Sequence, residues 1–290
     1  MRKIPGALCL CLLATAFGVN AAGCDDPHPL RFALTPYKSP ATQLAQYRPL
    51  ISQLEKVLAR RVEIVATPSY GTAIEGLLAD GIDLAELGPA SYAIAINRGA
   101  RITAFATFAF HPGPNTESAS TYRSLLIVRR DKGIDKIDAL RDTTLALTDP
   151  ASTSGAVLPR RAISQLTGVP LESFFRRVVF AGAHDRAIAA VRQDLVDAAF
   201  VSSAQLDDAL RHGKVQADDY RVLWRSPPIP YDPIVLRQGL CPALAAKIRH
   251  VFLGDATPLA RMFKELDSSG FVATSDEAYR EIRELFPASP

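Results

Sequence analysis

The sequence predicts an α/β protein built from two lobes that are joined by two crossing segments. Short apolar runs typical of strands alternate with segments in which apolar residues recur about every 3.6 positions, as in helices. Two proline-rich breaks, 111–118 (HPGPNTES) and 227–233 (PPIPYDP), interrupt this alternation. The length of 290 residues suits about two domains. We therefore expect mostly parallel sheets, with the chain entering a second lobe at the first break and returning at the second.

The first stretch alternates four strands with three helices. Gly81 ends the second helix, and Gly88-Pro89 begins the third, because proline in the first turn lacks an N–H that would have no partner there anyway. The expected strands are 30–35, 62–67, 82–87 and 100–110, and the expected helices are 41–60, 70–81 and 90–99.

The second stretch continues the same alternation and ends in helices. The expected strands are 122–130, 144–149, 176–182, 197–202, 220–226 and 234–237. The expected helices are 134–142, 152–165, 183–193, 203–212, 242–252, 256–267 and 275–286. The two breaks then divide the chain into a first lobe made of 23–115 and 230–290, and a second lobe made of 116–229.

The N-terminus resembles a secretory signal peptide. Arg2 and Lys3 precede an apolar run too short to span a bilayer, and small residues follow it. We expect residues 1–22 to be removed and the protein to reach the periplasm. The remaining cysteines, Cys24 and Cys241, then form an even pair in an oxidising compartment, which favours one disulfide. The alternative is that Ala21-Ala22-Gly23-Cys24 acts as an imperfect lipobox and that Cys24 carries a lipid anchor.

The charge of the mature chain is close to neutral. Loss of Arg2 and Lys3 leaves 31 basic and 30 acidic residues, a net charge of +1. A clustered basic face is expected of nucleic-acid-binding proteins, so we expect no nucleic-acid partner. Any preference for an anion must come from a local site.

Residues 152–155 (Ser-Thr-Ser-Gly) follow a strand and precede a helix. A serine or threonine at this position accepts a hydrogen bond from a backbone N–H one turn later. The other N–H groups point outward at the positive end of the helix dipole, where an oxyanion fits. One hydroxyl is enough for capping, and Ser152, Thr153 and Ser154 supply three. The pattern is consistent with an anion site or with a cap alone.

Other polar residues stand at the starts of elements. Ser91 and Tyr92 lie in the first turn after Gly88-Pro89, and Tyr70 and Tyr122 begin a helix and a strand. Each has an ordinary alternative as a cap or as packing at the edge of the core. His184 begins a helix and could donate to an anion, and Asp197 opens a strand. Helix N-termini at strand ends in both lobes would face one another across a cleft.

Signatures of enzymes are missing. The sequence holds no G-x-S-x-G elbow, no phosphate-binding G-x-x-x-x-G-K loop and no H-E-x-x-H zinc motif. Ser152, His184 and Asp185 form a poor triad, because adjacent His and Asp side chains diverge. We expect neither catalysis nor a cofactor or metal.

The order and spacing of four segments resemble the phosphate-, phosphite- and phosphonate-binding proteins of bacterial ABC importers. These segments are DLAELGPASYAIA, LTDPASTSGAVLPR, AGAHDRAIAAVRQDLVDAAFVS and SPPIPYDPIVLR. The resemblance implies a type II periplasmic-binding-protein fold whose cleft closes on a small oxyanion, and a permease in the inner membrane as partner. It also implies a monomer. Signalling to a membrane receptor is the alternative to import.

The resemblance also implies roles for individual residues. Ser152, Thr153 and Ser154 would hold the phosphorus oxygens, and Tyr70, Tyr92 and His184 would line the site. Asp197 matches a family acid that faces the ammonium of amine-bearing ligands. Two departures concern the ligand: Asp194 stands where glycine is usual, and Glu86 stands where the family has an apolar residue.

Overall fold

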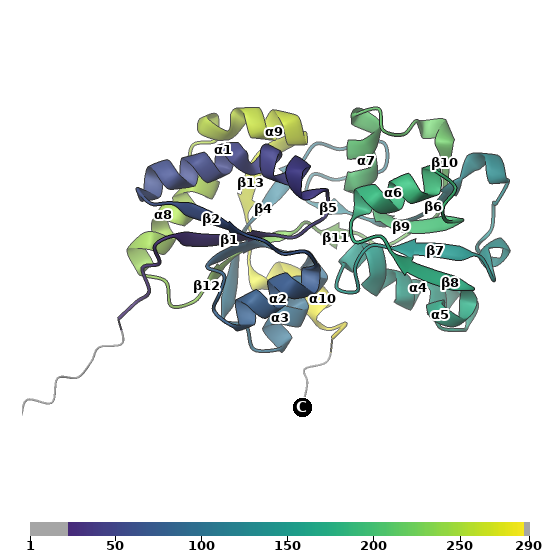
Figure 1. Ribbon diagram of the computed structural model, residues 1–290, viewed down its shortest axis with the longest axis horizontal. Helices are drawn as coiled ribbons and strands as arrows, with labels where there is room; N and C mark the ends of the chain where they lie inside the picture. The colour runs from purple at the N-terminus through teal and green to yellow at the C-terminus, as the bar shows by residue number, and fades with distance from the viewer. Residues whose placement is uncertain (1–22, 287–290) are drawn as a thin grey trace, which may run out of the picture.

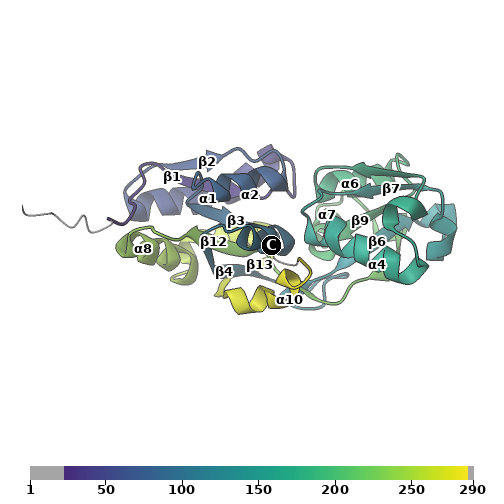
Figure 2. The same cartoon turned by 90° about the horizontal axis from the view of Figure 1, so that it is seen from below.

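The computed structural model describes residues 23–286, and it contains two α/β lobes side by side (Figures 1 and 2). The predicted signal peptide lies outside the described residues. In this part of the chain no helix combines the length and the apolar character needed to cross a membrane.

Lobe 1 is built on a six-stranded sheet with the order β13-β4-β12-β3-β1-β2. Its strands are β1 (Leu30–Leu34), β2 (Val62–Val65), β3 (Leu84–Glu86), β4 (Ile102–Phe110), β12 (Pro233–Arg237) and β13 (Ser268–Ala273). Its helices are α1 (Pro40–Leu58), α2 (Tyr70–Leu78), α3 (Pro89–Asn97), α8 (Pro242–Leu253), α9 (Ala260–Leu266) and α10 (Arg280–Arg283). One core joins α1, α8 and α9 to the sheet, and a second core holds α2 and α3 on the other face.

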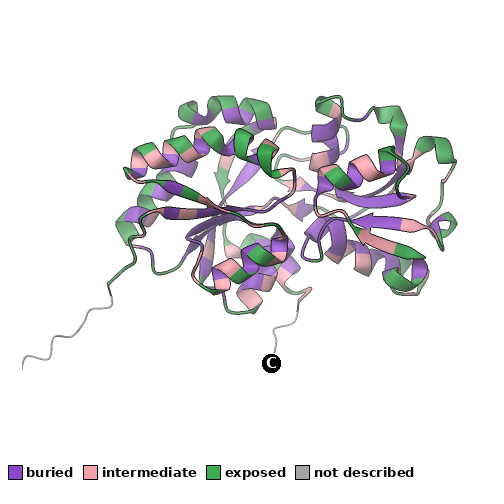
Figure 3. Ribbon diagram, viewed as in Figure 1, coloured by how far each residue is buried: buried purple, intermediate pink, exposed green. Residues whose placement is uncertain are grey.

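Lobe 2 repeats this layering around a five-stranded sheet with the order β10-β6-β9-β7-β8. Its strands are β6 (Ser124–Arg129), β7 (Thr144–Leu147), β8 (Arg177–Phe180), β9 (Ala198–Ser202) and β10 (Tyr220–Arg225). Its helices are α4 (Leu158–Thr167), α5 (Leu171–Phe174), α6 (His184–Arg192) and α7 (Ser203–Arg211). Helices α6 and α7 pack on one face, and α4 and α5 pack on the other. Both central sheets are buried between their helices (Figure 3).

The chain passes between the lobes twice, and the two passages run side by side. Strand β5 (Thr121–Tyr122) on the outward passage pairs antiparallel with β11 (Ile229–Pro230) on the return. The predicted fold class, two lobes with two crossings, is therefore confirmed.

The prediction of mostly parallel sheets was wrong, because both sheets are mixed. Strands β1, β2 and β3 are parallel, as are β7, β8 and β9. The strands by which the chain enters lobe 2 and re-enters lobe 1 run the other way: β6 pairs antiparallel with β9, and β12 pairs antiparallel with both β3 and β4. Strand β13 was not predicted, and it pairs antiparallel with β4.

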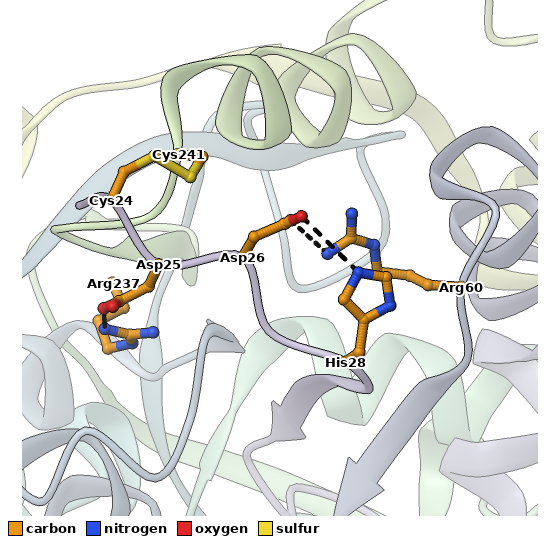
Figure 4. Close-up of a disulfide and its surroundings, with 7 residues drawn as sticks. All are labelled: Cys24, Asp25, Asp26, His28, Arg60, Arg237 and Cys241. Carbon is orange, nitrogen blue, oxygen red and sulfur yellow. Dashed lines mark hydrogen bonds and ion pairs between the residues drawn. A yellow bond between two sulfur atoms is a disulfide. The ribbon is translucent and has the colours of Figure 1, made fainter.

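A disulfide fastens the start of the described chain to lobe 1 (Figure 4). Cys24 and Cys241 are bonded across 217 residues of sequence, which confirms the predicted pairing. Two backbone hydrogen bonds beside it, from Asp25 N to Gly239 O and from Cys241 N to Asp25 O, are both 2.8 Å long. Arg237 pairs with the Asp25 carboxylate, and Arg60 pairs with that of Asp26. The N-terminal segment is therefore held by covalent, backbone and ionic contacts.

Candidate functional site

A pocket lies between the lobes, and its wall is drawn from both sheets and from the crossing segments. The part of the wall nearest the predicted anion site consists of Tyr70, Gly88, Tyr122, Ser152, Thr153, His184 and Ser202. The rest consists of Tyr37, Lys38, Glu86, Phe108, Phe110, His111, Gly113, Thr116, Ala204, Gln205, Asp207, Asp208, Arg211, Tyr231, Asp232, Leu266 and Asp267. The pocket thus brings together residues that are distant in sequence.

The predicted hydroxyl strip forms a helix N-terminus on the lobe 2 side of this pocket. Ser152 caps a π-helical turn, Thr153–Val157, that continues into α4, and its Oγ accepts from Gly155 N at 3.1 Å. The N–H groups of Thr153 and Ser154 stand in the first turn, where a helix offers them no acceptor. Gly155 is required here, because a Cβ would lie 1.8 Å from Thr148 Oγ1. The turn therefore presents amides and hydroxyls where an anion could bind.

The same strip touches lobe 1. Ala90 N, in the first turn of α3, donates to Thr153 Oγ1 at 2.8 Å. Ser91 Oγ donates to Ala151 O at 3.0 Å, and Tyr70 N donates to Asp149 Oδ2 at 3.2 Å. The N-termini of α2 and α3 therefore contact residues 149–153 of lobe 2 directly.

Tyr70 and Tyr122 place neutral phenols against the strip. Burial, followed by the charge of Asp232, raises the pKa of both phenols well above 10, while the hydroxyl of Ser152 near Tyr70, and those of Ser154 and Thr153 near Tyr122, oppose the rise. Both phenols therefore keep their protons and can donate hydrogen bonds. The Ser154 hydroxyl is itself buried without a hydrogen-bond partner among the described residues.

His184 supplies a further neutral donor from the start of α6. Its Nδ1 accepts from Ser202 N at 3.1 Å, and burial lowers its pKa to about 3. The ring is therefore neutral, and its proton resides on Nε2, which is free to donate. No carboxylate orients the ring, because Asp185 instead accepts from Ser39 N and Arg186 N. This arrangement lacks the acid–base chain that a hydrolytic triad needs.

Four predicted site residues do not line the pocket: Ser91, Tyr92, Ser154 and Asp197. Tyr92 points into the lobe 1 core, where its hydroxyl donates to Asp276 and its ring packs on Tyr279. Asp197 accepts from Thr144 N at 2.8 Å, at the end of β7 that is remote from Ser152. The structure therefore places Tyr92 and Asp197 outside the pocket wall. Ser91 is also absent from the wall, since its hydroxyl is used in the contact between the lobes.

Sequence reasoning singled out Glu86 and missed the other uncompensated carboxylate of the pocket wall, Asp232. The Glu86 carboxylate accepts from the Tyr47 hydroxyl, and burial raises its pKa to about 7 against the effects of Tyr47 and Lys38. Asp232 stands in the second proline-rich break, and burial, followed by the charge of Glu86, raises its pKa well above 3.8. Within residues 23–286 no donor hydrogen-bonds the Asp232 carboxylate.

The basic side chains of the wall are already paired. Lys38 Nζ lies 2.9 Å from Asp208 Oδ2, and Arg211 contacts Asp208 at 2.6 Å and Asp267 at 3.1 Å. Across residues 23–286, no group of three or more His, Cys, Asp or Glu side chains is arranged to hold a metal ion. The pocket wall therefore combines two sets of groups. Neutral donors come from the Ser152–Gly155 turn, Tyr70, Tyr122 and His184, which we call the neutral end, and carboxylates without full compensation come from Glu86 and Asp232, which we call the acidic end.

The buried state of His184 predicts how stability depends on pH. Its pKa is 6.5 when unfolded and about 3 when folded, so the unfolded chain binds the extra proton as pH falls below 6.5. Relative to His184→Asn, which keeps an acceptor for Ser202 N, the wild type should lose about 1.4 kcal/mol per pH unit between roughly 5.5 and 4. Urea unfolding of both proteins across this range provides the measurement.

Glu86 affects the pH dependence of stability in the opposite direction to His184, so the wild-type curve alone does not isolate the histidine. Its folded pKa of about 7 exceeds the unfolded value of 4.5, so its contribution to stability is lost as pH rises through that interval. The wild-type curve therefore mixes both effects, while the difference between wild type and His184→Asn isolates the histidine. A pH-independent difference would mean that folding does not lower the pKa of the ring.

Comparison with known proteins agrees with this geometry. Residues 32–279 match the family described as ABC transporter, phosphonate, periplasmic substrate-binding protein. The chain is 28% identical over 283 residues to the phosphate-import protein PhnD of Mycolicibacterium smegmatis, covering 91% of this chain and 84% of that protein. It is 29% identical over 262 residues to the phosphonates-binding periplasmic protein of Escherichia coli, covering 88% and 75%.

A solved structure supports the same assignment. The binding-protein component of an ABC phosphonate transporter from Pseudomonas aeruginosa superposes with a TM-score of 0.79 at 26% identity, covering 90% of this chain and 86% of that one. The family match spans most of the chain, and the fold has the two lobes and the pocket between them that the resemblance implied. The chain therefore belongs to the periplasmic substrate-binding proteins of phosphonate ABC transporters.

Proposed function

We propose that this protein binds a small phosphonate-, phosphite- or phosphate-type oxyanion in the pocket between its lobes, and that a cation-bearing phosphonate fits best. The observation that carries the proposal is that the pocket wall holds two kinds of group. The Ser152–Gly155 turn, the two tyrosines and His184 offer neutral donors. Glu86 and Asp232 add carboxylates to the same wall.

The neutral end is sufficient for useful affinity. A hydrogen bond to a charged group contributes about 1.5–3 kcal/mol, and micromolar binding needs about 8 kcal/mol. The amides of the Ser152–Gly155 turn, two phenols and one imidazole supply enough donors to reach that total after the entropy cost of association. An anion held by dipoles also needs no free lysine or arginine, and the wall of this pocket has none to offer, since Lys38 and Arg211 are paired.

The acidic end favours a ligand that also carries a positive charge. A buried carboxylate without a donor is costly, and an ammonium group would restore both its charge balance and its hydrogen bonding. The rings of Tyr231, Tyr122 and Phe110, which pack against one another, supply an apolar wall on which a short organic spacer could lie. An aminoalkylphosphonate combines these features.

A thermal-shift panel tests the proposal. Aminoethylphosphonate should raise the midpoint of unfolding more than ethylphosphonate, methylphosphonate, phosphite or phosphate at equal concentration. A ligand at about 100 times its dissociation constant stabilises the native state by about 2.7 kcal/mol. For a chain of this size, such a gain raises the midpoint by roughly 5–10 °C. Sulfate is the control anion without phosphorus, and a panel in which no phosphorus compound acts would refute the proposal.

The family implies a membrane permease as partner and a location in the periplasm or outside the cell. Import is favoured over signalling to a receptor, because the family consists of transporter components. We further propose that the protein acts as a monomer without catalytic activity, and that Cys24 is not lipidated, since its sulfur is bonded to Cys241. Intact mass before and after reduction would distinguish the disulfide from a lipid adduct.

A further inference from the structure

Three consecutive residues between β1 and α1 contact lobe 2 separately from the α3 contact. We name Tyr37–Ser39 the clasp. Tyr37 O accepts from His184 N at 3.2 Å, and Ser39 N donates to Asp185 Oδ2 at 3.1 Å. Between them, Lys38 Nζ lies 2.9 Å from Asp208 Oδ2. Three consecutive residues of lobe 1 therefore contact the start of α6 and the C-terminal half of α7.

Lys38 is buried in this arrangement, with only 3% of its side chain exposed. Its hydrogen-bond partner from its own lobe is Gln46 Oε1, at 3.4 Å, and Glu86 of the same lobe is near enough for its carboxyl group to feel the charge of Lys38. A buried ammonium is tolerated only when an opposite charge compensates the loss of water. The hydrogen-bonding partner that provides this charge, Asp208, belongs to the other lobe. The ion pair therefore exists only while the two lobes are together.

Asp208 is held in place by its own lobe. Arg211 donates to its Oδ1 at 2.6 Å, and His212 Nδ1 lies 3.4 Å from the same oxygen. Its carboxylate is thus paired and oriented independently of Lys38. Loss of Lys38 leaves Asp208 paired with Arg211, so a variant at Lys38 should not leave an isolated charge in lobe 2.

We propose that the Lys38–Asp208 ion pair is the latch of the closed cleft, and that it slows ligand release without contacting the ligand. The pair joins one residue of each lobe, and both residues stand on the pocket wall. Hinged closure keeps a bound molecule until the lobes part, so a contact made only in the closed state acts mainly on the dissociation rate. Lys38 is then a positioning residue, and the latch does not depend on which oxyanion binds.

The alternative is that Lys38 binds the anion directly, and substitution of Asp208 separates the two roles. If Lys38 is a latch, Asp208→Asn weakens binding as Lys38→Met does, and the double variant is no worse than either single variant. If Lys38 is an anion ligand, Asp208→Asn frees its ammonium and tightens binding. Lys132→Met is the matched control, because Lys132 pairs with Asp194 at 2.6 Å within lobe 2 and away from the pocket.

Stopped-flow release of aminoethylphosphonate, with inorganic phosphate as a second probe, gives the first readout. We expect the dissociation rate to rise at least tenfold in Lys38→Met and in Asp208→Asn, with an association rate within about threefold of wild type. Lys38→Arg should restore slow release, and Lys132→Met should leave it unchanged. An unchanged dissociation rate, additive losses in the double variant, or tighter binding by Asp208→Asn would overturn the latch.

Hydrogen exchange gives a readout that needs no ligand. The amides of Ser39 and His184 donate across the lobes, so their protection reports contact at the clasp. Lys38→Met should reduce protection at both amides and leave the β6–β9 core of lobe 2 unchanged. Equal protection in wild type and variant would overturn the latch. If no phosphorus compound binds the wild type, the proposed ligand is wrong, and this exchange measurement still decides on the latch.

Discussion

Replacing Ser152 and Ser154 together by alanine should weaken oxyanion binding by more than tenfold and leave the fold intact. Ser152 stands on the pocket wall, and the Ser154 hydroxyl is buried just behind it, beside Tyr122, with no hydrogen-bond partner among residues 23–286. Each hydroxyl can donate to a charged oxygen, at about 1.5–3 kcal/mol per bond. Two lost donors exceed the roughly 1.4 kcal/mol that corresponds to tenfold. Isothermal calorimetry with the best ligand of the panel measures the loss.

The control must separate binding from capping, because Ser152 also caps its helix. Ser69 does the same for α2: its Oγ accepts from Thr72 N at 3.1 Å, and it lies outside the pocket wall. Ser69→Ala should therefore cost about 1 kcal/mol of stability and no affinity. If Ser152→Ala with Ser154→Ala lowers stability as Ser69→Ala does but leaves the affinity unchanged, the strip is a cap and the anion binds elsewhere.

Local sequence signals were enough to locate the Ser152–Gly155 turn, because all the residues that form it are adjacent in the sequence. A strand, a short turn and a run of hydroxyls before a helix define a helix N-terminus within about ten residues, as Ser152–Gly155 does. The helix starts at Pro89 and His184 could be found in the same way. What the local pattern did not contain is orientation. Tyr92 follows Ser91 directly, yet its side chain turns into the lobe 1 core, where Asp276 accepts its hydrogen bond.

The acidic end could not be predicted, because its members meet only through the fold. Glu86 ends β3, Asp232 precedes β12, and the two strands become neighbours only after the chain has passed through the whole of lobe 2. The Lys38–Asp208 pair joins residues 170 positions apart. Strand β13 was missed for a related reason: SSGFVA has a weak strand pattern, and its pairing with β4 determines its conformation.

A nearly neutral chain can still hold a strongly polarised pocket. Five carboxylates stand on the pocket wall (Glu86, Asp207, Asp208, Asp232 and Asp267), against two permanent cations, Lys38 and Arg211. Donors already contact Glu86, Asp207 and Asp208, and Arg211 pairs with Asp267. Asp232 is thus the carboxylate with the least compensation. A cationic ligand would therefore gain the most binding energy by contacting this residue.

Asp232→Asn should therefore reduce affinity for aminoethylphosphonate at least tenfold and leave ethylphosphonate unchanged or slightly tighter. The two ligands share the phosphonate and the spacer and differ in the ammonium, so their ratio isolates the acidic end. The charge-assisted bond that is lost is worth about 1.5–3 kcal/mol. Calorimetry on both ligands with wild type and variant gives the ratio, and equal losses for both would show that Asp232 shapes the pocket without contacting the cation.

Two further variants, Glu86→Gln and Glu75→Gln, provide comparisons for the affinity ratio of the two ligands. Glu86 already accepts from Tyr47, so its substitution should lower the ratio less than Asp232→Asn does. Glu75 pairs with Arg98 on the exposed surface and should have no effect. Because the pKa of Glu86 is about 7 in the absence of a cation, it takes up a proton as pH falls from 8 to 6. The preference of the wild type for the ammonium-bearing ligand should weaken over that interval. Glu86→Gln should remove this pH dependence and retain the share of the preference that comes from Asp232.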